Sequence, residues 1–165
     1  MTLAYSDVGR GPTMMFFHNA GSNRDLWSKQ VEHYSSRFRC VTLDLPGYGL
    51  GEEIHGDATL PRYARFVSAA VRELSQGEPP ILVGHCIGAA MVLAATLEDP
   101  GLARSLVLFN VATYTGIKTG GYGPLLENLG PEEIGALVPW AKPNEPYQGT
   151  VFVVRPDRLL PLVRS

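Results

Sequence analysis

One continuous stretch, PPILVGHCIGAAMVLAATLE at residues 79–98, constrains the fold of this 165-residue chain more than any other. A short apolar run at 81–83 leads into a cysteine, Cys86, that has a glycine two positions away on each side. The residues behind Cys86 are apolar on nearly every side as far as Leu97. This order is typical of a buried strand that turns sharply into a helix packed centrally against a sheet.

Short apolar runs recur along the rest of the chain, which indicates an α/β protein. They lie at residues 14–17, 40–45, 106–109 and 151–154. The gaps between the runs up to residue 109 are long enough to hold helices. Such alternation predicts a parallel, doubly wound sheet with helices on both faces.

Two amphipathic helices are predicted between these runs. The first follows Ser22 and Asp25, which resemble a capping box, and its apolar residues are Trp27, Val31 and Tyr34. The second has Thr59 available as its cap and carries a stripe of apolar side chains, Leu60, Tyr63, Val67, Val71 and Leu74.

The charge balance and the cysteine count exclude several classes of protein. Fourteen basic and 16 acidic side chains leave no positive excess for a nucleic acid or an anionic membrane, so neither is expected as a partner. Two cysteines do not make a disulfide scaffold, and the first residues lack the features of a secretory signal. We therefore expect a cytoplasmic protein, and the oligomeric state is left open.

The surroundings of Cys86 favour a nucleophile over an inert buried thiol. A sharp strand-to-helix turn holds its central residue in a strained conformation, and small residues on both sides relieve the crowding. The N-terminus of the following helix presents unpaired backbone N–H groups, which favour negative charge on the side chain and later on a substrate oxygen. Cys40, by contrast, lies within a strand and is expected only to pack.

These residues resemble the nucleophile elbow GxSxG of the α/β-hydrolase superfamily, with Cys86 at the serine position. Three further segments resemble the family in the right order, at 18–27 (HNAGSNRDLW), 43–51 (LDLPGYGLG) and 149–161 (GTVFVVRPDRLLP). The resemblance implies that Cys86 attacks a carbonyl carbon. It also implies that the backbone N–H groups of Ala20 and Ile87 form the oxyanion hole and that Asp157 is the acid of a triad. No metal or organic cofactor is expected.

The resemblance also implies an incomplete fold. The family places a histidine after its eighth strand, whereas the four histidines of this chain are His18, His33, His55 and His85. We expect an α/β-hydrolase core at 1–112, a lid-like loop at 113–148, and a possible seventh family strand with its acid turn at 149–165. Together they form a single domain that is shortened at both ends.

Three side chains near the predicted site are assigned supporting roles. His18 is expected to order the oxyanion loop, and His85 flanks the nucleophile but points away from it. Asp44 is expected to hold the turn that follows its strand.

The predicted activity is that of an esterase, thioesterase or lactone hydrolase acting on a small-molecule ester or thioester. The alternatives are a non-catalytic fragment of the fold and a ligand-binding remnant that retains the hydrolase pocket.

Overall fold

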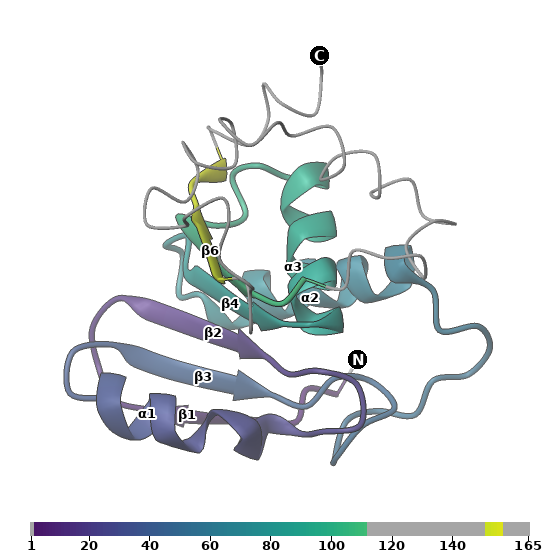
Figure 1. Ribbon diagram of the computed structural model, residues 1–165, viewed down its shortest axis with the longest axis horizontal. Helices are drawn as coiled ribbons and strands as arrows, with labels where there is room; N and C mark the ends of the chain where they lie inside the picture. Colours follow the sequence, from purple (N-terminus) through teal and green to yellow (C-terminus); the bar gives the residue numbers. More distant parts are fainter. Residues whose placement is uncertain (1, 112–150, 157–165) are drawn as a thin grey trace, which may run out of the picture.

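Six strands form one sheet in the computed structural model, which describes residues 2–111 and 151–156. Their order across the sheet is β1-β3-β2-β4-β5-β6 (Figure 1). The strands are β1 (Tyr5–Val8), β2 (Thr13–Phe17), β3 (Arg39–Leu43), β4 (Ile81–His85), β5 (Ser105–Phe109) and β6 (Val151–Val154). Every apolar run of the sequence is therefore a strand, as predicted.

The predicted parallel sheet is present, and the structure adds two antiparallel strands at its edges. The four inner strands β3, β2, β4 and β5 are parallel, but β1 and β6, at the two edges, run antiparallel to their neighbours. Four residues, 9–12, join β1 to β2. A parallel crossover needs a dozen residues or more, so this link forces the chain to reverse. The sheet is consequently a mixed one.

Helices cover both faces of the sheet, as the α/β pattern predicts. On one face, α2 (Leu60–Leu74) packs against α3 (Ile87–Glu98), and both lie over a core that includes Phe17 and Leu82. On the other face, η1 (Arg24–Trp27) and α1 (Ser28–Tyr34) lie near β2 and β3, and Trp27 packs on Phe16. Helix α3 is buried along most of its length, which explains its uniformly apolar sequence.

The first predicted helix begins differently from the expectation. Asn23, and not Ser22, is the capping residue, and its side chain accepts a hydrogen bond of 2.8 Å from the backbone N–H of Asp25. The cap starts a 3-10 turn, and the α-helix follows only at Ser28. Thr59 does precede α2 as predicted, although its side chain makes no capping bond.

A buried arginine at the start of β3 joins three elements. The Arg39 guanidinium contacts both carboxylate oxygens of Asp7 on β1, at 2.6 to 3.0 Å, and donates to the carbonyl of Leu74 at the end of α2 at 2.6 Å. These bonds anchor the antiparallel edge strand to the rest of the sheet. Because parallel strands end at the same edge, the far ends of β2, β3, β4 and β5 present their loops together.

Candidate active site

Cys86 occupies a sharp turn between β4 and α3. Its backbone angles are φ 54° and ψ −112°, which lie outside the conformations that L-residues ordinarily adopt. The backbone N–H of Cys86 donates to the carbonyl of Phe109 on β5 at 2.9 Å, and the Cys86 carbonyl accepts from Ala90 at 3.2 Å. The neighbouring strand and the first turn of the helix thus hold the strained residue in place, and its thiol is half-buried.

The two glycines around Cys86 are required by close backbone packing. A Cβ atom at Gly84 would lie 2.5 Å from the Cα atom of Ala89, inside the first turn of α3. A Cβ atom at Gly88 would lie 2.4 Å from the carbonyl oxygen of Phe17 and 2.5 Å from that of His18. The start of α3 is therefore pressed against the end of β2, where the segment at 18–27 begins.

His18 is fully buried, and backbone groups engage both of its ring nitrogens. The backbone N–H of Leu45 donates to Nε2 at 3.0 Å, so Nδ1 carries the proton and donates to the Asn19 carbonyl at 2.8 Å. Burial lowers the pKa of the imidazole below its ordinary value and keeps the ring neutral. In this arrangement the ring has no nitrogen left to act as a base toward Cys86.

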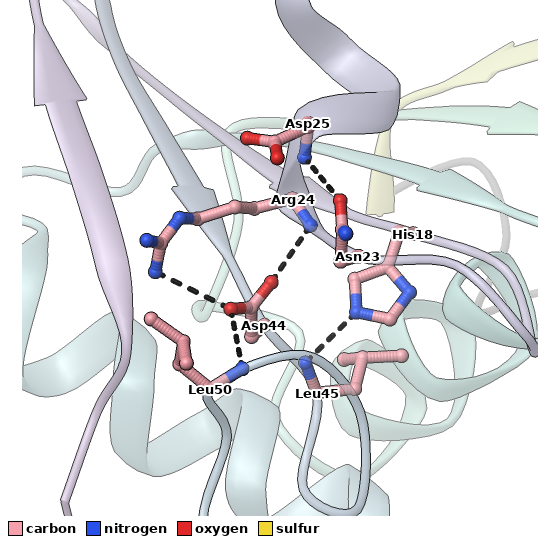
Figure 2. A network of polar contacts seen from close by, with 7 residues as sticks. All are labelled: His18, Asn23, Arg24, Asp25, Asp44, Leu45 and Leu50. Atoms are coloured by element: carbon pink, nitrogen blue, oxygen red, sulfur yellow. Dashed lines mark hydrogen bonds and ion pairs between the residues drawn. The ribbon is translucent and has the colours of Figure 1, made fainter.

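Asp44 is the centre of a polar network at the same edge of the sheet (Figure 2). Its buried carboxylate accepts from the backbone N–H of Arg24 at 2.7 Å, from that of Leu50 at 3.0 Å, and from the Arg24 guanidinium at 3.3 Å. Asp44 thus holds its own turn, as predicted, and also reaches across to η1. The role of Arg24 was not predicted from the sequence, because an arginine in a polar loop carries no local signal of a buried partner.

The two predicted oxyanion donors belong to the two segments that pack together at Gly88. Ile87 is the first residue of α3, and Ala20 is exposed on the segment that follows β2. Among the residues that the structure describes, no acceptor binds the backbone N–H of either one.

The second cysteine has the opposite character. Cys40 lies on β3 with 1% of its surface exposed, and burial raises the pKa of its thiol. Its sulfur lies 3.9 Å from the carbonyl of Phe38. The expected packing role suits this environment.

The predicted triad acid lies outside the described residues. Asp157 follows β6, in which Val151 pairs with Phe109 and Val154 pairs with Leu106. Strand β6 thus leads the chain away from the edge that carries Cys86, and the acid role of Asp157 stays a prediction.

His85 ends β4 and is half-buried. Within 2–111 and 151–156, no side chain hydrogen-bonds the Cys86 thiol.

The fold and the elbow agree with the sequence comparisons. The profile of the α/β-hydrolase fold family matches residues 12–138, which is most of the chain. This protein belongs to the α/β-hydrolase fold family.

Two relatives and one solved structure of the same fold illustrate the range of similarity. A 2-(acetamidomethylene)succinate hydrolase from Mesorhizobium japonicum is 32% identical over 69% of this chain and 41% of its own length. A pimeloyl-[acyl-carrier protein] methyl ester esterase from Methylococcus capsulatus is 34% identical over 66% of this chain and 40% of its own. A thermophilic esterase from Thermogutta terrifontis superposes with a TM-score of 0.65 at 23% identity, over 81% of this chain and 50% of that structure. The chain thus spans about two fifths of the length of the two curated relatives.

Neither a metal centre nor a membrane span is found in the part of the chain that the structure describes. No group of three or more His, Cys, Asp or Glu side chains is placed there to hold a metal ion. None of the helices there is long and apolar enough to cross a bilayer.

Proposed function

We propose that this chain carries the nucleophile and the oxyanion hole of an esterase or thioesterase, with Cys86 as the attacking residue. One observation carries the proposal, namely the strained backbone of Cys86 at a strand-to-helix turn whose flanking glycines are packed against backbone atoms. A strained residue at such a turn presents its side chain beside the first N–H groups of the helix. One relative is named as a hydrolase and another as a methyl ester esterase, and both names support the same class of reaction.

The reaction follows from the groups around the thiol. The Cys86 sulfur attacks the carbonyl carbon of an ester or thioester, and its proton passes to water. The carbonyl electron pair moves onto oxygen, where the N–H groups of Ala20 and Ile87 stabilise the negative charge. Collapse of this intermediate expels an alkoxide or thiolate, which takes up the proton released to water, and leaves an acyl group on Cys86. Water then attacks the thioester, which releases the acid and restores the cysteine.

Three further residues are assigned in this proposal. His18 keeps the segment that bears Ala20 attached to the turn after β3, through its bond from Leu45. Asp157 is proposed as the acid that orients a histidine base, which requires the chain after β6 to return to the edge that carries Cys86. His85 flanks the nucleophile without contacting the substrate. The substrate is a small-molecule ester or thioester, and no cofactor takes part.

A rapid burst of leaving group tests the proposal. Mixed with excess p-nitrophenyl acetate, the protein should release about one equivalent of p-nitrophenolate per chain quickly, with slow release afterwards. Cys86→Ala should show no burst, and Cys86→Ser should show a slower one, because a thiol is partly ionised at neutral pH and a hydroxyl is not. Cys40→Ala serves as the matched control and should retain the full burst. An equal burst from Cys86→Ala would disprove the proposal.

The binding remnant remains the second candidate, because no side chain within 2–111 and 151–156 hydrogen-bonds the Cys86 thiol. It predicts no burst, together with a rise in melting temperature when a small carboxylic acid or ester is added. A burst that depends on Cys86 would exclude it.

A further inference from the structure

The segment that bears Ala20 is fastened to the turn after β3 at both of its ends. At its beginning, the backbone N–H of Leu45 binds the ring of His18 at 3.0 Å. At its end, the backbone N–H of Arg24 binds the carboxylate of Asp44 at 2.7 Å. Only five residues, 19–23, lie between these two bonds, and Ala20 is one of them. Figure 2 shows both bonds converging on the same turn.

Among the described residues, Asp44 is the only side chain that binds the Arg24 end of this segment. Its side chain is 2% exposed, and its two oxygens accept three hydrogen bonds from Arg24 and Leu50. The turn is shaped around the carboxylate, since a Cβ atom at Gly49 would lie 2.6 Å from the Asp44 carboxyl carbon. Gly49 also has a φ of 55°, so the turn and the carboxylate require glycine together.

We propose that Asp44 is a positioning residue that fixes the oxyanion donor at Ala20 by clamping the Arg24 end of its segment to the turn after β3. The proposal rests on the proposed function. It adds that a residue two strands away from the nucleophile, without touching the substrate, sets the geometry of one of the two donors. An oxyanion hole depends on such preorganisation, because its N–H groups act only where charge develops.

Two reagents that attack Cys86 differently separate this role from a general loss of structure. Acetylation by p-nitrophenyl acetate forms a tetrahedral oxyanion, whereas alkylation by iodoacetamide displaces iodide from a saturated carbon and forms none. Asp44→Asn should therefore slow acetylation by about 10- to 100-fold. The rate of alkylation should remain within about twofold of that of the wild type, because the elbow itself is intact.

Two variants support the comparison. Arg24→Ala removes only the guanidinium contact of 3.3 Å and keeps the backbone bond to Asp44. Arg24→Ala should lower the acetylation rate by less than Asp44→Asn does. It therefore provides a milder test if Asp44→Asn does not fold. Asp99→Asn breaks an exposed ion pair with Arg72 and is the matched control for the loss of an aspartate charge. It should change neither rate.

Hydrogen exchange tests the clamp independently of any reaction. In Asp44→Asn, amides in residues 19–26 should exchange roughly tenfold faster, while those in residues 84–90 should be unchanged. If the wild type is not acetylated at Cys86, the proposed function fails, and this comparison still decides whether Asp44 fixes the segment.

Three outcomes would overturn the proposal. The first is exchange in residues 19–26 that is unchanged in Asp44→Asn and Arg24→Ala. The second is a rate of acetylation that Asp44→Asn leaves unchanged, where the wild type is acetylated at Cys86, even if exchange is faster. The third is an equal loss of both rates, which would mean that Asp44 supports the elbow as a whole.

Discussion

At the scale of single residues, the glycines beside Cys86 are constrained by backbone atoms of neighbouring elements. Gly88→Ala would place a methyl group 2.4 Å from the Phe17 carbonyl oxygen and 2.5 Å from that of His18, and backbone atoms cannot easily move aside. We predict a loss of about 1–3 kcal/mol in the free energy of unfolding, measured by urea denaturation. Gly101→Ala, whose nearest atom would be a side-chain oxygen at 3.5 Å, should be nearly neutral. Equal losses from both variants would refute this account of the elbow.

The buried imidazole of His18 predicts a pH dependence of stability. Its pKa in the folded protein is lowered by burial, so below about pH 6.5 the unfolded chain binds a proton that the folded protein resists. Stability should therefore be complete above the unfolded pKa and fall as the pH drops below it, until the folded pKa is reached. The slope from this group is at most about 1.4 kcal/mol per pH unit.

The measurement is urea unfolding of the wild type and of His18→Gln at several values between pH 5 and 8. His18→Gln lacks the titrating group, so the difference in stability between the two proteins should shrink as the pH falls. A difference that is constant across this range would show that His18 is not held neutral.

The two thiols should react at very different rates. Cys40 is buried and its pKa is raised, whereas Cys86 is half-buried at a turn. A disulfide reagent such as 5,5'-dithiobis(2-nitrobenzoic acid) should modify one thiol rapidly in the native protein and two in urea. Peptide mapping should locate the rapid site at Cys86. Rapid modification of Cys40 in the native state would contradict the environment described for it.

Residue types predicted the elbow well and the polar network poorly. The spacing of Gly84, Cys86 and Gly88 between an apolar strand and an apolar helix carries local information, and the structure has the expected turn there. The partners of Asp44 lie 20 residues before it and six after it, and nothing in a polar loop distinguishes Arg24 from a solvated arginine. Contacts of that kind appear only when the loops are brought together at one edge.

At the scale of elements, the attachment of β1 depends on a charged contact. Asp7→Asn removes the carboxylate that binds the Arg39 guanidinium and leaves that buried cation with weaker partners. We predict a loss of about 1.5–3 kcal/mol in urea unfolding, as for hydrogen bonds between charged groups. Asp99→Asn breaks a pair whose side chains are 67% and 44% exposed, and should cost less than about 1 kcal/mol. If the control costs as much as Asp7→Asn, Arg39 does not anchor the edge strand.

The directions of the edge strands show what apolar runs cannot predict. The run at 151–154 predicted a strand and β6 is one, but alternating or continuous apolar residues read the same in either direction. The direction matters, because an antiparallel β6 ends at the edge opposite Cys86. For β1, the short link to β2 did carry the information, since four residues are too few for a crossover.

At the scale of the whole molecule, the described residues form the part of an α/β-hydrolase fold that bears the proposed nucleophile and the proposed oxyanion donors. The chain spans about two fifths of the length of its curated relatives. The segments at 18–27, 44–51 and 84–90 lie far apart in the sequence, yet the ends of β2, β3 and β4 bring them to one edge of the sheet. Four motifs in the family's order were therefore enough to predict the fold, while the predicted lid at 113–148 lies outside the described residues.

The most direct test of the central claim is the mass of the protein after a brief reaction with p-nitrophenyl acetate. We predict an added mass of one acetyl group per chain, which peptide mapping places on Cys86 and which hydroxylamine removes. Cys86→Ala should gain no such mass under the same conditions. An acetyl group found on other residues, with the Cys86 peptide unmodified, would contradict the assignment of this cysteine as the nucleophile.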